Sequence, residues 1–289
     1  MPRGISGIIY GPAKSGKTLS AGLLVLGKEG VFFGKQAAVV PVNTYYNFAP
    51  PTVYTPKSVE DCVRALDASL GAGKRRFVVD DLTLMIQEDS AAAGGKPNWP
   101  KLVQNVVKIA EIAKKIEDAG GILWVTAHER APRDYNGKSL RGGPDLPGQL
   151  TETFSGMVSI VLRNKYEETS APYKYQLITG PQKDFISGDR LNVFPNPSPL
   201  NLLEGMLLAG FNVPYATELG EWGPKAIEAF SIEFAKDIDN WRNLMVELGA
   251  KLPGKDPKHV RFVLVQAMHR AIFRTAGTLD KLLADLIAE

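Results

Sequence analysis

The chain has 289 residues, with 34 lysines and arginines against 31 aspartates and glutamates, which gives a formal net charge of +3. Hydrophobic residues make up 44% and charged residues 22%. These values are typical of a folded globular protein and exclude disorder, collagen and coiled coil as descriptions of the whole chain. The charge balance also excludes a strongly basic nucleic-acid binder, although it leaves room for a local basic surface.

The single cysteine and the length of the apolar runs indicate where such a chain would work. Cys62 alone can form neither a disulfide framework nor a cysteine-based zinc site, and it fits a reducing cytosol as a small core residue. No apolar run reaches the roughly 18 residues that a membrane span requires, and residues 1–11 lack the long apolar region of a signal peptide. We therefore expect a soluble, cytoplasmic protein without a membrane partner.

Short apolar runs alternate with helical patterns over the first two-thirds of the chain. We expect strands at 5–10, 37–42, 77–79, 122–126, 157–162 and 173–179, and helices at 17–26, 58–70 and 99–119. This alternation predicts an α/β fold with a mainly parallel sheet flanked by helices. The last two strands have no helix between them and are expected to extend the sheet in the antiparallel direction.

The pattern changes at three closely spaced prolines, Pro195, Pro197 and Pro199. Beyond them no strand is predicted, and helical periodicity covers 225–248, 256–275 and a short segment from Thr278. We therefore predict a core domain at 1–200 and a helical C-terminal region at 201–289, whose helices are candidates for binding a protein partner.

A glycine-rich segment follows the first predicted strand. The residues Gly11, Pro12, Ala13, Lys14, Ser15, Gly16, Lys17 and Thr18 match the pattern G-x-x-x-x-G-K-[ST] in full. Glycines let the backbone curl so that its N–H groups point at phosphate oxygens, and the following helix adds its positive end. Lys17 would bind the β- and γ-phosphates, while the Thr18 hydroxyl would bind Mg²⁺. We predict a nucleotide site at residues 11–18, completed by Leu19.

Two aspartates follow the predicted strand at 77–79. An acid at the end of a strand downstream of such a loop can hold Mg²⁺ directly or through water, and Asp80 is our candidate. Alternatively, Asp80 is a helix N-cap or a turn residue. Asp81 either polarises the attacking water or simply caps the helix that begins there.

The strand at 122–126 delivers three polar residues to the carboxyl end of the sheet, where ligands bind in open α/β sheets: Thr126, His128 and Glu129. A polar group at this place can sense the γ-phosphate by hydrogen bonding, and His128 is the candidate. The alternative is a structural histidine that is satisfied by a loop carbonyl.

The segments GPAKSGKT, FVVDDL and WVTAHER, in this order and spacing, resemble the RecA-like P-loop ATPases. The nearest resemblance is to small phage-encoded nucleotide-binding proteins that include single-strand-annealing, RecA-like recombinases, and it extends to 142–148 and covers about residues 4–195. The resemblance implies a RecA-like core that binds and hydrolyses ATP with Mg²⁺. It also implies a homo-oligomer with the nucleotide at the subunit interface, which acts on single-stranded DNA in phage recombination or replication, in the bacterial host cytoplasm.

In RecA-like proteins the polar residue that corresponds to His128 couples the γ-phosphate to a DNA-binding loop, and here that loop would be 129–149. Its candidate DNA-binding residues are Arg130, Arg133, Tyr135, Lys138 and Arg141. Arginine and lysine can neutralise DNA phosphates, and an aromatic ring can stack on a base. The alternative is an ordinary solvated loop. A second loop, 87–98, is a weaker DNA candidate.

RecA-like ATPases also use cations from a late hairpin to reach the γ-phosphate of the neighbouring subunit. Lys183 and Arg190 lie in the corresponding segment, 180–190, and would offset charge that develops during phosphoryl transfer. Alternatively, both are ordinary surface cations.

One feature departs from the RecA-like pattern. A catalytic glutamate usually ends the strand after the P-loop helix, but residues 30–59 contain no acid, and Asn43 lies at about that place. An amide cannot accept a proton as a carboxylate does. Asp81, Glu88 or Glu129 would have to substitute, or hydrolysis is slow and ATP acts as an assembly switch. Two other functions therefore stay open: a nucleotide-dependent assembly or motor subunit, and a P-loop small-molecule kinase with 130–149 as its lid.

Overall fold

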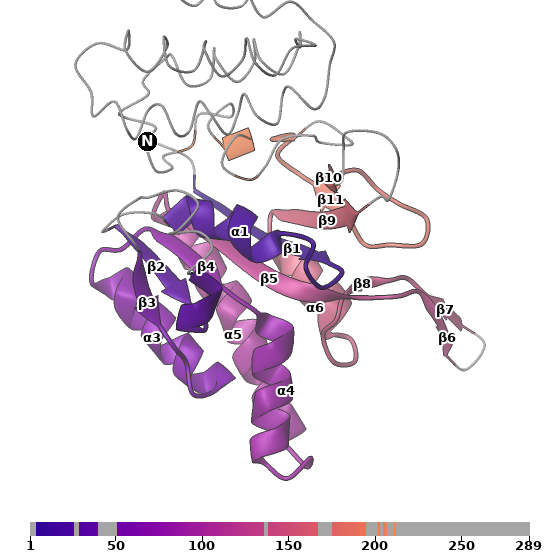
Figure 1. The fold of residues 1–289 in the computed structure, drawn as a ribbon, viewed down its shortest axis with the longest axis horizontal. Coiled ribbons are helices and arrows are strands. Elements are labelled where there is room, and N and C mark those ends of the chain that lie inside the picture. The colour runs from indigo at the N-terminus through magenta and orange to yellow at the C-terminus, as the bar shows by residue number, and fades with distance from the viewer. Residues whose placement is uncertain are drawn as a thin grey trace, which may run out of the picture.

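The computed structural model describes residues 4–25, 29–39, 51–135, 138–166 and 175–194, together with Leu202, Gly205, Met206 and Phe211. Figure 1 shows how these elements are arranged. In chain order they are β1 (Ile5–Gly11), α1 (Lys17–Gly22), the 3-10 helix η1 (Leu23–Val25), β2 (Gly30–Phe33), β3 (Thr52–Tyr54), α3 (Val59–Gly71), β4 (Arg76–Val79), α4 (Leu82–Ala92), α5 (Trp99–Asp118), β5 (Ile122–Arg130), β6 (Arg133–Tyr135), β7 (Lys138–Leu140), β8 (Gly143–Pro144), α6 (Leu150–Met157), β9 (Ile160–Tyr166), β10 (Tyr175–Ile178) and β11 (Gly188–Asp189).

Nine of the described strands form one sheet. Its order is β10-β9-β1-β5-β4-β2-β3, with β11 added to β9 and β8 added to β5. The six strands from β9 to β3 are parallel to their neighbours, while β10, β11 and β8 are antiparallel. This confirms the expected α/β class, a mainly parallel sheet with an antiparallel extension. Strands β6 and β7 form a separate hairpin.

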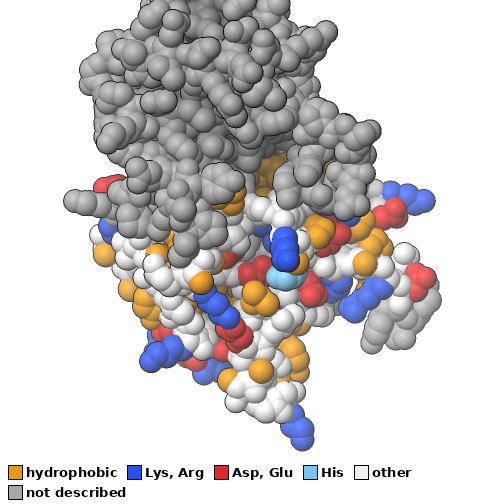
Figure 2. All heavy atoms as spheres, viewed as in Figure 1, with side chains coloured by type: hydrophobic (Ala, Val, Ile, Leu, Met, Phe, Trp, Pro, Cys, Tyr) orange, Lys and Arg blue, Asp and Glu red, His pale blue; other side chains and the backbone are white. Residues whose placement is uncertain are grey.

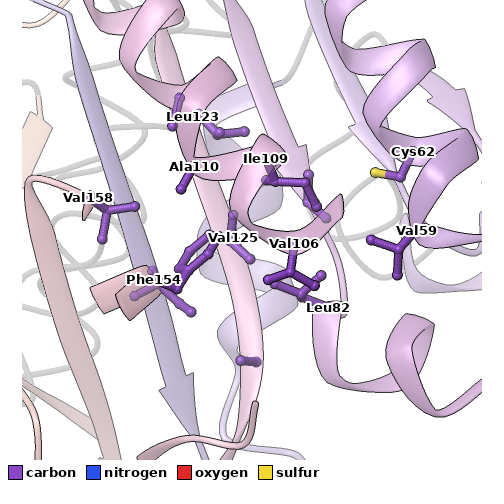
Figure 3. Close-up of a cluster of buried hydrophobic side chains, with 14 of the residues drawn as sticks. Val59, Cys62, Leu82, Val106, Ile109, Ala110, Leu123, Val125, Phe154 and Val158 are labelled. Carbon is purple, nitrogen blue, oxygen red and sulfur yellow. The ribbon is translucent and has the colours of Figure 1, made fainter. Parts of the chain in front are cut away.

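Helices cover both faces of the sheet, which explains why the central strands are buried along most of their length. All seven residues of β1 are buried. Ile8 and Tyr10 belong to a core cluster that the sheet shares with α3, α4, α5 and α6, part of which is seen in Figure 3. Helix α1 packs against the other face (Figure 1). Because successive strand residues point to opposite faces, a strand between two helical layers is buried on both sides, and most of its residues are apolar.

Most of the predicted helices and strands are confirmed, and capping residues explain where two of the helices begin. Ser58 caps α3 by accepting a hydrogen bond from the Asp61 N–H at 3.0 Å, and Asn98 caps α5 in the same way. Cys62 is buried in α3, and burial raises the pKa of its thiol to about 12.

Within the described residues, no helix has the length and hydropathy needed to cross a membrane.

Three predictions of secondary structure are wrong. The strand expected at 37–42 lies earlier, at Gly30–Phe33, and 36–39 are helical, as their alanines favour. Helix α6 was not predicted, because the sequence offers no capping residue at its start: the N-cap is Gln149, whose side chain makes no capping hydrogen bond. Because α6 extends to Met157, strand β9 starts at Ile160, later than the strand expected at 157–162. The expected loop 87–98 is helical as far as Ala92.

The predicted boundary near residue 200 and the helices expected at 225–248, 256–275 and from Thr278 lie outside the described residues. So does Asn43, and residues 40–42 of the strand that was expected there.

Candidate nucleotide-binding site

The glycine-rich loop connects the carboxyl end of β1 to α1. The backbone geometry explains why two of its positions are glycine. Gly16 has a φ of 82°, in the left-handed region that strains residues with a side chain. A Cβ on Gly11 would lie only 2.4 Å from the Asn164 carbonyl oxygen of β9. One glycine therefore permits the turn, and the other permits the close approach of β1 and β9.

Lys17 is buried at the base of this loop, with 6% of its surface exposed. Its ammonium group donates to the carbonyl oxygens of Gly11 at 3.0 Å and Pro12 at 2.8 Å. Burial lowers the pKa of Lys17, and the negative charges of Asp81 and Asp80 oppose that shift. The loop thus holds a buried ammonium group against its own carbonyl oxygens.

Asp80 follows β4 and is joined to two hydroxyl groups. Its Oδ1 accepts hydrogen bonds from Thr126 at 2.6 Å and from Thr18 at 2.8 Å. Strand β5 lies between β1 and β4, so Thr126 reaches Asp80 from the neighbouring strand. Burial raises the pKa of the Asp80 carboxyl, while the two hydroxyl donors lower it. The alternative assignment of Asp80 as an N-cap is wrong, because the next residue holds that position.

Asp81 caps α4 and also faces His128. Its Oδ1 accepts from the Leu84 N–H at 3.2 Å, and its Oδ2 lies 3.5 Å from the Nε2 of His128. Burial raises the pKa of Asp81 to about 6, and His128 opposes part of this shift. The His128 backbone N–H donates to the Thr83 hydroxyl at 3.0 Å. Asp81 therefore combines the capping role with a position inside the site.

These groups line one pocket with a volume of about 280 Å³ at the carboxyl end of the sheet. Seven of the predicted site residues line it: Ala13, Lys14, Lys17, Thr18, Asp80, Asp81 and His128. Figure 2 shows acidic and basic side chains gathered around a histidine on this face. Lys35 and Glu88 form an exposed ion pair beside the pocket, which both residues line. Of the candidate substitutes for the missing glutamate, Asp81 and Glu88 thus lie at the pocket.

The donor set suits Mg²⁺. A hydroxyl and a carboxylate, Thr18 and Asp80, are hard oxygen ligands, and they lie within hydrogen-bond distance of each other. Among the described residues there is no cluster of three or more histidine, cysteine or acidic side chains suited to a metal.

Glu129 lies outside the residues that line this pocket and is bound elsewhere. Both of its carboxylate oxygens accept from Arg163, from Nε at 2.8 Å and from Nη2 at 3.0 Å. The Arg163 guanidinium also lies 3.4 Å from the centre of the Phe185 ring. As a proton acceptor, Glu129 would first have to leave a bidentate ion pair that is largely shielded from water.

The sequence analysis missed the contribution of β9. The side-chain amide of Asn164 donates to the Ser15 carbonyl at 2.7 Å, in a buried contact, and so holds the glycine-rich loop from behind. Asn164 and Arg163 are neighbours that serve opposite faces of the strand. The run of polar residues that follows the apolar start of β9, Arg163, Asn164 and Lys165, was the available signal.

The basic loop after β5 is a protruding β-hairpin, β6–β7, which Figure 1 shows extending away from the sheet. Arg133 is exposed on β6, and Tyr135 pairs in register with Lys138 of β7. Arg130 is half-buried instead, and its guanidinium donates to the Leu146 carbonyl at 3.1 Å. Burial lowers the pKa of Arg130. Arg141 is exposed just after β7.

The two cations expected to act on a neighbouring subunit are both exposed. Lys183 lies in the segment between β10 and β11. Arg190 follows β11 and donates to the Gly156 carbonyl at 2.8 Å.

No protein-family model and no curated protein matches the chain. A solved structure that it is similar to is the KaiC-like protein PH0186 from the hyperthermophilic archaeon Pyrococcus horikoshii OT3. The TM-score is 0.42 at 15% sequence identity, over 65% of this chain and 84% of that chain.

Proposed function

We propose that this protein is a Mg²⁺-dependent RecA-like ATPase that acts as a homo-oligomer on single-stranded DNA, in phage recombination or replication in the host cytoplasm. The observation that carries the nucleotide part is the joined pair Thr18 and Asp80, 2.8 Å apart, beside the buried cation Lys17. A metal-binding hydroxyl, a carboxylate and a phosphate-binding ammonium thus meet at one pocket, as ATP with Mg²⁺ requires.

Each residue has a chemical task in this proposal. Lys17 binds phosphate oxygens in place of the loop carbonyls that it now contacts. Thr18 and Asp80 hold Mg²⁺, which supplies positive charge to the phosphates. Asp81 accepts the proton of the attacking water, a task for which a pKa of about 6 suits it better than the ordinary value of 3.8. His128, beside Asp81, is placed to hydrogen-bond the γ-phosphate.

Strand β5 supports the proposed link between nucleotide and DNA. Within five residues it carries Thr126, bound to Asp80, then His128, facing Asp81, and finally Arg130, bound to the loop at Leu146. The hairpin β6–β7 begins three residues later. Strand β5 therefore gives a short, continuous connection along the chain from the nucleotide pocket to the start of the basic hairpin.

The oligomer adds two further proposals. Lys183 or Arg190, both exposed, would reach the γ-phosphate of a neighbouring subunit, so that the nucleotide would lie at the interface. The C-terminal helices would bind a protein partner.

The test is ATP hydrolysis with and without single-stranded DNA, with Lys17→Ala as the blank. The double variant Arg133→Ala/Lys138→Ala removes both cations of the hairpin, and the matched control Arg64→Ala/Lys108→Ala removes two exposed cations on α3 and α5. We expect DNA to stimulate hydrolysis in the wild type and in the control, and this stimulation to be lost in the hairpin variant, because the hairpin cations neutralise DNA phosphates.

Two results would count against the proposal. An unchanged rate with DNA, together with no DNA binding at low salt, would remove the DNA role and favour the assembly-switch function. Transfer of phosphate to a small acceptor instead of water would favour the kinase.

A further inference from the structure

A second pocket lies beside α6 and shares no lining residue with the nucleotide pocket. Its volume is about 320 Å³, and its walls come from α6, the start of β9 and the segment 186–190, with Arg141 added from the end of the hairpin. It therefore joins Arg141 and Arg190, which the sequence had placed in two separate roles.

The lining is divided between apolar and charged groups. Val158, Val161 and Ile186 supply apolar surface, whereas Arg141, Arg190 and Glu152 supply charge. Two arginines against one glutamate leave a net charge of +1 at the pocket. Arg190 donates to the Gly156 carbonyl, a neutral acceptor, and Arg141 makes no hydrogen bond or ion pair with any residue that the structure describes. Both guanidinium groups thus keep donors for an anion.

A buried hydroxyl gives an independent indication. Ser155 lines the pocket, is only 6% exposed, and its Oγ has no hydrogen-bond partner among the described residues. Buried hydroxyl groups are usually paired, because leaving one unpaired is unfavourable. A ligand with an acceptor atom would satisfy it.

We propose that this pocket binds a phosphate-bearing ligand the size of one nucleotide. Arg141 and Arg190 bind the phosphate, for which planar guanidinium groups are well suited, and Ser155 donates a further hydrogen bond. The less polar part of the ligand lies on the apolar surface. The volume is at the lower end of small-molecule pockets, about 300–1,000 Å³, and is too large for inorganic phosphate alone. The ligand is either a free mononucleotide or one unit of a nucleic-acid strand, and neither depends on ATP binding at the P-loop.

The test measures equilibrium binding to the full chain carrying Lys17→Ala, which weakens the other phosphate site. Three probes are titrated at low salt: thymidine 5′-monophosphate, a short oligothymidylate and inorganic phosphate. We expect saturable binding of a nucleotide probe, weakened about tenfold or more by Arg141→Ala and by Arg190→Ala, because each removes hydrogen bonds to a charged group. The matched control Arg64→Ala, an exposed arginine on α3, is expected to bind as the parent does.

Ser155→Ala separates a ligand role from a structural one. The hydroxyl has no partner to lose, so the variant is expected to melt at or above the parent temperature while binding the nucleotide probe more weakly.

The two nucleotide probes show whether the ligand is a free mononucleotide or part of a nucleic-acid strand. Equal affinity for both indicates a free mononucleotide, and tighter binding of the oligothymidylate indicates a strand. The proposal is overturned if no nucleotide probe binds saturably, if inorganic phosphate binds as tightly as the nucleotides, or if the arginine variants bind like the control. If Lys17→Ala abolishes ATP hydrolysis, or if the wild type does not hydrolyse ATP at all, the result concerns the proposed function of the P-loop and does not bear on the second pocket.

Discussion

Replacing Thr126 by valine tests the polar centre of the site most directly. Valine keeps the shape of threonine but has no hydroxyl, and Thr126 is completely buried, so water cannot take its place. The bond that is lost, at 2.6 Å, is one of two hydroxyl bonds to the buried Asp80 carboxylate. Hydrogen bonds to charged groups contribute about 1.5–3 kcal/mol. We expect the free energy of unfolding to fall by that amount at pH 7.

Denaturant unfolding, followed by tryptophan fluorescence, to which the buried Trp124 contributes, gives the measurement. The control is Thr153→Val, the same change at an exposed position on α6, which should stay within about 0.5 kcal/mol of wild type. Asp80→Ala and the double variant complete a thermodynamic cycle. If the hydrogen bond is the cause, Thr126→Val costs much less once the carboxylate is absent.

The pH dependence gives a second check with a definite sign. The Thr126 hydroxyl favours the charged form of Asp80 and lowers its pKa. The loss in stability should therefore be largest above that pKa and shrink as the pH falls and the carboxylate is protonated. A loss no larger than that of the control, or a coupling below about 0.5 kcal/mol in the cycle, would show that this bond does not hold Asp80.

Two other predictions follow from the same site. Burial raises the pKa of Asp81 to about 6 from 3.8, so the folded protein binds this proton more tightly than the unfolded chain. Asp81→Asn, which keeps the cap, should therefore melt at a higher temperature than wild type at pH 7, and this advantage should shrink as the pH falls from 6 toward 3.8; it should also slow ATP hydrolysis. Asn164→Ala removes the 2.7 Å bond to the Ser15 carbonyl and should raise the Kd for ATP about fivefold, measured by calorimetry against the exposed Gln104→Ala. Unchanged melting or an unchanged Kd would contradict the respective prediction.

The parts of the site that the sequence predicted depend on local signals. The glycine-rich loop, Asp80 after its strand and His128 after the next are each recognisable within a window of a few residues. They share one place because parallel strands end at one edge of the sheet, which the alternation of strands and helices already implied. Whether Lys17, Asp81 or His128 performs the proposed chemistry stays a prediction.

The parts that the sequence could not predict depend on strand order. Asn164 reaches Ser15 across 149 positions, and Arg163 reaches Glu129 across 34. Both contacts arise because β9 lies beside β1, which no local pattern encodes. Strand β2 was missed for another reason: a buried central strand of four residues, Gly30–Phe33, is too short to show any periodicity.

The contacts in the site also indicate how it would receive a nucleotide. Lys17 contacts neutral carbonyls of its own loop, so exchanging them for charged phosphate oxygens strengthens its hydrogen bonds. Thr18 has a second task in this exchange, because its hydroxyl oxygen would offer a lone pair to Mg²⁺ while its proton is donated to Asp80. Thr126 has no such second task, because it is fully buried and points its hydroxyl at Asp80. Thr126 is therefore the group that keeps Asp80 oriented during this exchange, and Thr126→Val should weaken ATP binding more with Mg²⁺ than without it.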